Sequence, residues 1–145
     1  MNKLWFLDDE RTVDDVTWIS YDYFRFTDKR YFTDPQQFVS ACLDIVDSGD
    51  TLSIPTVLSL DHDLGAYDQN GQELSGRWAF DSVLNPCIQD VIRGAQFADT
   101  AAAFIRTTWI FHTQNPVARI SMHQMLEMYR NALDCIERGE GLNER

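Results

Sequence analysis

Two short apolar runs that end abruptly in ionisable residues place the strongest constraint on the fold of this chain. Residues 4–7 lead directly into Asp8 and Asp9, and residues 56–60 lead into Asp61-His62-Asp63. Runs this short, rich in apolar and β-branched residues, suit strands that are buried on both faces of a parallel sheet. We therefore expect two central strands whose carboxyl ends open to solvent.

The segment between these runs predicts a further strand and a helix. Aromatic residues within 23–33 indicate a strand, although charged residues interrupt its pattern. Asp34 and Pro35 then form a favourable helix start, because a carboxylate can cap the first turn and proline fits the first helical position. Apolar residues at helical spacing continue toward Gly49, where the helix should end.

The middle of the chain predicts a loop and two helices. Residues 66–75 are polar and contain an obvious turn, so they should form a loop over the strand ends. The helical pattern over 78–92 should be kinked or split by Asn85-Pro86. Asp99 is expected to cap a further short helix.

The last part of the chain predicts a strand over 107–111 and a long helix. Asn115 can cap that helix, Pro116 can open it, and Gly139 should close it. Strands thus alternate with helices, which predicts an α/β sandwich of three layers with a mainly parallel sheet. We expect one domain over residues 1–139, followed by a solvated tail over 140–145.

Composition narrows the classes of partner. The chain has 145 residues, a formal net charge of −11 and 44% apolar residues, and no apolar run reaches the length of a membrane span. The acidic balance argues against binding along a nucleic-acid backbone, although a nucleotide or an RNA end can still bind locally. The three cysteines are widely spaced and are expected to be reduced core residues. The N-terminus lacks a signal-peptide pattern, so we expect a cytoplasmic protein that binds no membrane.

The strand ends form the candidate site, because ligands of open parallel sheets bind beside the carboxyl ends of the strands. Several carboxylates meeting there would repel one another unless a cation shared them. Oxygen ligands favour Mg²⁺ or Mn²⁺ over zinc, so Asp8, Asp9 and Asp61 are the candidate ligands. The alternative is that Asp9 merely begins a solvated loop.

His62, His112 and Asp63 follow the same strand ends and are candidate catalytic residues. Imidazole titrates near neutral pH, so either histidine can serve as a general acid or base. The alternative is that both histidines are structural and bonded to neighbouring carboxylates, and that Asp63 caps a turn. His123, inside the last helix, is expected to be a surface or packing residue.

A phosphate can be accommodated near the start of the last helix. Asn115 opens that helix, whose first N–H groups carry partial positive charge, and Arg119 lies in its first turn. Arg11 is a second candidate cation, since the planar guanidinium matches phosphate oxygens. A salt bridge to the surplus acidic residues is the alternative for each arginine.

Three motifs, LWFLDDER at 4–11, LSLDHDLG at 58–65 and FHTQNPVARISM at 111–122, together resemble the cyclic-phosphate-processing receiver-like family. The resemblance implies a receiver-like, flavodoxin-like fold, here without a regular fifth strand and helix. The chain departs from the family pattern at Ala118, where glycine is expected, and in a longer stretch over 66–106. The positions that the resemblance marks are Asp8, Asp9, Asp61, His62, Asp63, His112, Asn115 and Arg119.

Together these features predict a metal-assisted phosphoesterase that acts on a cyclic phosphate, either a 2′,3′-cyclic RNA end or a small cyclic nucleotide. The alternative is a catalytically silent receiver-like module that binds a protein or a ligand. A phosphorelay role is disfavoured, because Lys3 and Lys29 are the only lysines and neither can end a fifth strand. The sequence does not predict an oligomeric state.

Overall fold

A sheet of four parallel strands forms the centre of the computed structural model, which describes residues 2–21 and 25–139. The spatial order is β2-β1-β3-β4, as expected for an α/β receiver-like fold. Within the described residues the sheet has no fifth strand. The strands are β1 (Lys3–Leu7), β2 (Asp28–Phe32), β3 (Val57–Leu60) and β4 (Thr108–Phe111).

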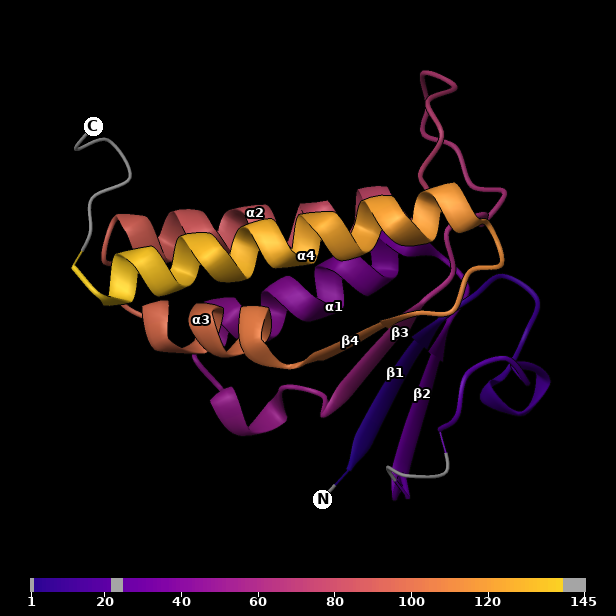
Figure 1. Cartoon of the computed structure of the whole chain (residues 1–145), viewed down its shortest axis with the longest axis horizontal. Coiled ribbons are helices and arrows are strands. Elements are labelled where there is room, and N and C mark those ends of the chain that lie inside the picture. The colour runs from indigo at the N-terminus through magenta and orange to yellow at the C-terminus, as the bar shows by residue number, and fades with distance from the viewer. Residues whose placement is uncertain (1, 22–24, 140–145) are drawn as a thin grey trace.

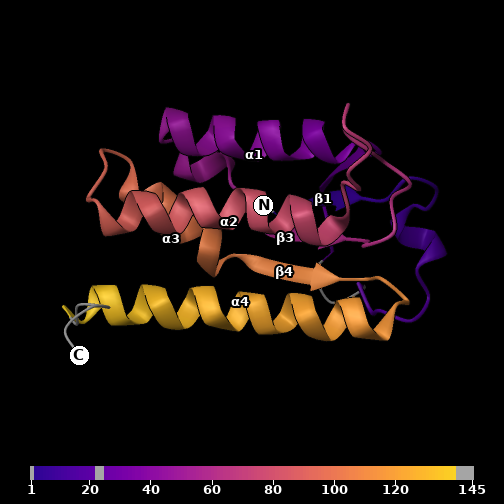
Figure 2. The ribbon, with the colours of Figure 1, turned by 90° about the horizontal axis from the view of Figure 1, so that it is seen from above.

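All four helices cover one face of the sheet (Figures 1 and 2). The opposite face is covered by described residues of the segment after β1, from the 3₁₀ turn at Val13–Asp15 to Tyr21, together with Phe26, and the sheet is thus the middle of three layers. The handedness of parallel connections explains this division. The chain moves one way along the sheet from β1 to β2 and the other way from β2 to β3, so the two connections must cross opposite faces. The helices are α1 (Pro35–Ser48), α2 (Gly76–Ile92), α3 (Ala98–Arg106) and α4 (Pro116–Glu137).

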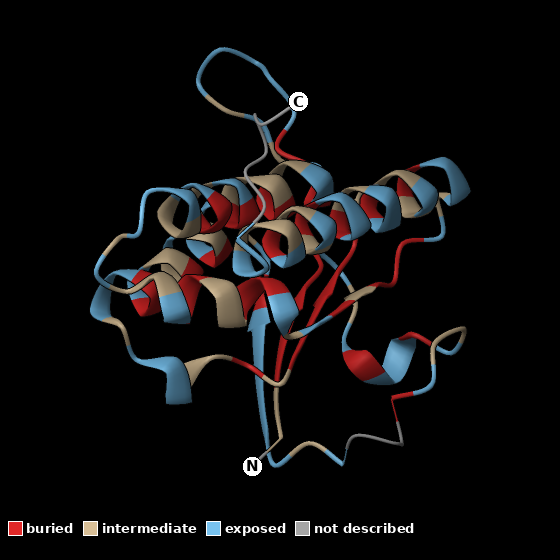
Figure 3. Cartoon of the chain, turned by 60° about the vertical axis from the view of Figure 1, so that its left-hand side comes forward, coloured by how far each residue is buried: buried red, intermediate tan, exposed pale blue. Residues whose placement is uncertain are grey.

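Alternate strand residues belong to two separate cores. Leu58 and Leu60 of β3 pack beneath the helices, whereas Leu4 and Phe6 of β1 pack against the segment on the other face. The buried strands between the two layers are visible in Figure 3. The two buried faces account for the continuous apolar runs in the sequence.

Most predicted element boundaries are confirmed. The strand expected within 23–33 is β2, although residues 22–24 lie outside the described part of the chain. α1 ends at Gly49, which adopts the left-handed conformation, and Gly139 does so after α4. The tail expected over 140–145 also lies outside the described residues.

Two predictions about the helices need correction. Of the kink or split predicted at Asn85-Pro86, the split does not occur: α2 is continuous from Gly76 to Ile92 and buries residues on both sides of the proline, including Val83 and Cys87. Burial of that face outweighs the lost backbone hydrogen bond. Asp99 does not cap α3 either: Phe97 is the N-cap residue, and Asp99 lies in the first turn, where its charge favours the positive end of the helix.

The remaining composition-based expectations concern the cysteines and membranes. Cys42 and Cys87 are buried, Cys135 is half-buried, and all three are free thiols. Among the described residues, no helix combines the length and apolar character needed to cross a bilayer.

Pro35 and Pro116 begin their helices as predicted, after the capping residues Asp34 and Asn115.

Candidate functional site

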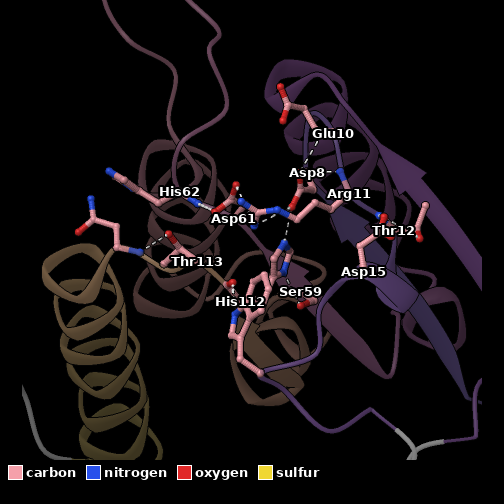
Figure 4. Close-up of polar contacts among 12 residues, drawn as sticks. Asp8, Glu10, Arg11, Thr12, Asp15, Ser59, Asp61, His62, His112 and Thr113 are labelled. Carbon is pink, nitrogen blue, oxygen red and sulfur yellow. Dashed lines mark hydrogen bonds and ion pairs between the residues drawn. The ribbon is translucent and has the colours of Figure 1, made fainter.

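Three polar residues from distant parts of the sequence lie side by side because the strands that precede them are in register. Leu7, Leu60 and Phe111 are paired across β1, β3 and β4. The backbone ladder continues one residue further: the Asp61 N–H donates to the Leu7 carbonyl at 2.9 Å, and the His112 N–H donates to the Leu60 carbonyl at 3.0 Å. Asp8, Asp61 and His112 therefore form the next row at the carboxyl edge of the sheet (Figure 4).

Asp8, Asp9 and Asp61 form a carboxylate cluster at this edge. Each residue offers an oxygen, and these three atoms all lie within 4.8 Å of one another. Asp8 and Asp61 are buried, whereas Asp9 is exposed. The predicted metal ligands are thus brought together, and their oxygen atoms are of the kind that Mg²⁺ and Mn²⁺ prefer.

The hydrogen bonds of Asp8 keep its carboxylate fixed. Its Oδ1 accepts from the backbone N–H groups of Glu10 at 2.9 Å and Arg11 at 3.0 Å, and its Oδ2 lies 3.0 Å from Nε2 of His112. Burial raises the pKa of Asp8, but the hydrogen bonds from His112 and the two N–H groups outweigh burial and leave the pKa below its ordinary value. Asp8 is therefore ionised at neutral pH.

The surroundings of Asp9 shift its pKa upward, opposite to the shift at Asp8. Burial and the charges of Asp8 and Asp61 raise the pKa of Asp9 above its ordinary value. The carboxylates of the cluster thus repel one another, and a bound cation would relieve that repulsion.

Arg11 supplies a positive charge beside the cluster. Its Nη1 lies 3.7 Å from Oδ2 of Asp8 and 4.0 Å from Oδ2 of Asp61, and its guanidinium lies over the Trp18 ring at 5.2 Å. Nη1 is buried, but has no hydrogen-bond partner among the described residues. Arg11 is close enough to attract both carboxylates without forming a tight bidentate pair with either.

His112 is more deeply buried than we expected for a residue that meets a substrate. It is 0% exposed, its ring stacks on Phe6 at 4.3 Å, and its two nitrogens face Asp8 and Ser59. No ring nitrogen is left for a substrate in this arrangement. Its position instead suits a residue that orients Asp8.

A cavity of about 410 Å³ adjoins the carboxylate cluster. Arg11, Asp63 and Asn115 line it as the sequence predicts, whereas His62 and Arg119 are not among its lining residues. Asp9 and Asp61, two of the three clustered carboxylates, also line the cavity. The other lining residues are Glu10, Thr113 and Gln114. The cavity is open and strongly polar, as a site for a small charged ligand must be.

Comparison with known proteins identifies the family of this chain. The model of the family described as the cyclic-phosphate processing receiver domain matches residues 3–128. The chain belongs to this family. No curated protein and no solved structure matches the chain. Every residue predicted for the site lies within the part of this receiver domain that the family model covers.

Asn115 and Arg119 shape the loop that borders the cavity of the receiver domain. The Asn115 side chain accepts a hydrogen bond from the Ala118 N–H at 3.1 Å and so caps α4. Arg119 donates from Nε and Nη2 to the Thr113 carbonyl, at 3.2 and 2.6 Å. The guanidinium is thus engaged with the backbone carbonyl of Thr113, and the binding of a phosphate by Arg119 stays a prediction. Ala118, where the resemblance leads us to expect glycine, is helical and buried.

The two remaining histidines lie outside the cavity. The His62 backbone N–H donates to Oδ1 of Asp61 at 2.8 Å, while its ring points away from the carboxylates (Figure 4). His123 is exposed and packs edge-on against Phe111 at 4.9 Å, as expected for a packing residue. Neither histidine lines the cavity, and a catalytic role for His62 stays a prediction.

Sequence reasoning missed several residues that support the site. Ser59 bonds to Nδ1 of His112 and to the Tyr21 hydroxyl, and Trp18 donates from Nε1 to the His112 carbonyl at 2.8 Å. Ser59 had a detectable signal, because a serine inside the apolar run before Asp61 must find a buried partner. Tyr21 and Trp18 had no comparable signal, since aromatic residues are common in any core.

Gly76 anchors α2 against the end of β3. Its N–H donates to the His62 carbonyl at 2.9 Å. A Cβ atom at this position would overlap the carbonyl oxygen of Asp61. Only glycine therefore lets the first turn of α2 approach the backbone that carries Asp61.

Proposed function

We propose that this receiver domain is a divalent-metal-dependent phosphoesterase that opens a cyclic phosphate by hydrolysis. The observation that carries the proposal is the meeting of Asp8, Asp9 and Asp61, whose oxygens lie within 4.8 Å of one another beside a polar cavity. The family name supplies the substrate class. The candidate substrates are a 2′,3′-cyclic RNA end and a small cyclic nucleotide.

The three carboxylates fit Mg²⁺ or Mn²⁺ by the chemistry of their oxygen donors. They would hold the cation, which when bound neutralises phosphate charge and lowers the pKa of a coordinated water. The hydrogen bonds that fix Asp8 support this role, since ligating carboxylates are themselves hydrogen-bonded in metal sites.

Arg11 and Asp63 are the residues of the cavity wall best suited to act on the substrate. In hydrolysis a water oxygen bonds to phosphorus, the ring P–O bond breaks, one water proton leaves, and the ring oxygen gains a proton. We assign proton acceptance to the Asp63 carboxylate and phosphate binding to the Arg11 guanidinium. The remaining polar wall, which includes Asn115, would orient the substrate.

The other residues predicted for catalysis receive supporting roles in this proposal. His112 would position Asp8, since both of its ring nitrogens are occupied. Arg119 would hold the Thr113 carbonyl and so shape the cavity loop. We assign no catalytic step to His62, whose ring does not line the cavity.

Turnover of defined substrates tests the proposal. The purified protein is incubated with RNA that ends in a 2′,3′-cyclic phosphate and with cyclic mononucleotides, in Mn²⁺ or in EDTA. We expect metal-dependent ring opening that Asp61→Asn abolishes and that Asp44→Asn, an exposed site on α1, leaves unchanged. Absence of metal-dependent turnover on every substrate would refute the enzyme assignment.

A second candidate function is a catalytically silent module that binds a ligand or partner. The position of Arg11 favours it, because a guanidinium within 4.0 Å of Asp8 and Asp61 can neutralise part of the acidic cluster without a metal. Calorimetry separates the two functions. A silent module would bind a cyclic nucleotide without consuming it, and EDTA would leave the affinity unchanged.

A further inference from the structure

We infer that Ser59 and Tyr21 are positioning residues for the carboxylate site, because they fix the tautomer and the orientation of the His112 ring that holds Asp8. The inference deepens the proposed function and rests on it where a bound cation is concerned. The hydrogen-bonded chain itself belongs to the protein without metal.

Four side chains form a continuous chain from one face of the sheet to its carboxyl edge. The Tyr21 hydroxyl lies 2.6 Å from Oγ of Ser59, which lies 2.8 Å from Nδ1 of His112. The Nε2 atom of His112 lies 3.0 Å from Oδ2 of Asp8. Figure 4 shows Ser59 of β3, His112 after β4 and Asp8 after β1 converging.

The chemistry of the groups sets the direction of this chain. An ionised carboxylate only accepts hydrogen bonds, so Nε2 of His112 must carry the hydrogen. In the neutral ring Nδ1 is then the acceptor, and Ser59 must donate to it. The Ser59 oxygen in turn accepts from Tyr21, so that both hydroxyl hydrogens have an acceptor.

Burial makes each link matter. Ser59 and His112 are 0% exposed, and Asp8 and Tyr21 are 3% and 8% exposed. A buried hydroxyl that loses its partner is costly, and water has little access to replace it. With Oδ1 of Asp8 held by backbone N–H groups and Oδ2 by His112, the carboxylate cannot rotate freely. Ser59 and Tyr21 thus act on Asp8 through His112.

Metal affinity is the first measurement, with Mn²⁺ alone as the probe in calorimetry. Removal of an outer-shell partner of a metal ligand typically costs about 10–100-fold in affinity. We expect Ser59→Ala to weaken Mn²⁺ binding about 10-fold, and Tyr21→Phe to weaken it less. Tyr129→Phe is the matched control, because it removes another hydroxyl hydrogen bond, to Asp81 in α2, and should leave the affinity unchanged.

The histidine tautomer is the second measurement and needs no metal. Nitrogen-15 NMR of the imidazole rings should show His112 protonated at Nε2 and hydrogen-bonded at an unprotonated Nδ1, with His112→Gln used for assignment. Ser59→Ala should shift the Nδ1 resonance toward that of a free acceptor. A role confined to packing would move neither the tautomer signal nor the metal affinity.

The outcomes separate this inference from the proposed function. If Ser59→Ala binds Mn²⁺ as well as the wild type does, the inference is wrong and the proposed function still stands. The same holds if His112 is protonated at Nδ1 alone. A wild-type protein that binds no Mn²⁺ overturns both. Weaker binding together with the expected nitrogen shift supports the inference even if no cyclic phosphate is turned over.

Discussion

The Nε2 atom of His112 lies 3.0 Å from Oδ2 of Asp8, a residue 104 positions earlier in the chain. Both side chains are buried, so the contact is shielded from water and links the ends of β4 and β1 directly. A buried hydrogen bond to a charged group stabilises a protein more than a neutral one does. The same contact therefore serves the fold and the candidate site.

Loss of this contact should destabilise the protein. His112→Phe keeps a planar ring against Phe6 but leaves Asp8 and Ser59 without their ring partner. We expect the free energy of unfolding in urea to fall by about 1–3 kcal/mol. His123→Phe is the control, and should change it by less than about 0.5 kcal/mol because His123 is exposed. Equal effects of the two substitutions would contradict the prediction.

Metal should stabilise the folded state through the carboxylate cluster. A ligand that binds only the folded protein adds about 2.7 kcal/mol at 100 times its Kd. We expect Mn²⁺ to raise the melting temperature of the wild type and of Asp44→Asn, but not that of Asp61→Asn. Differential scanning fluorimetry with an EDTA reference measures this, and a rise for Asp61→Asn equal to that of the wild type would argue against the proposed ligand set.

Neutralising Asp9 should stabilise the metal-free protein. Because its folded pKa is raised, ionised Asp9 opposes folding, and this penalty develops as the pH rises above about 3.8. Asp9→Asn should therefore increase the free energy of unfolding at pH 7 by a few tenths of a kcal/mol, since solvent screens this exposed side chain. The gain should vanish near pH 3, and an equal gain at both pH values would point to another cause.

Gly76→Ala should be destabilising although alanine ordinarily favours a helix. The added methyl would overlap the Asp61 carbonyl oxygen and force the start of α2 away from β3. We expect a loss of about 2–3 kcal/mol in urea unfolding and a lower affinity for Mn²⁺. Arg77→Ala, at the next and exposed position, should stay within about 0.5 kcal/mol. A stabilised Gly76→Ala variant would show that α2 can move at no cost.

Alkaline pH should weaken the fold through Tyr21. Burial and the charge of Asp8 raise the pKa of Tyr21 to about 12. The unfolded chain releases this proton near pH 10, so stability is lost as the pH rises from about 10 through 12. Tyr21→Phe should lose about 2–3 kcal/mol less than the wild type across this range. Parallel stability curves for the two proteins would contradict this assignment.

The sequence determined the alternation of strands and helices, because each element has a recognisable residue pattern within its own segment. Apolar runs before Asp8 and Asp61 fix two buried strands, and Asp34 and Asn115 mark helix starts by capping chemistry. The clustering of Asp8, Asp9 and Asp61 also followed from sequence, since parallel strands end at a common edge.

Only the tertiary structure decided which predicted residues face the cavity and which lie behind it. His112 has the same sequence signature as a catalytic histidine, yet register and burial direct its nitrogens to Asp8 and Ser59. Arg119 is drawn to the Thr113 carbonyl, a contact that depends on the path of a loop. The direction of a side chain is set by packing between segments distant in the chain, and local residue patterns do not encode that packing.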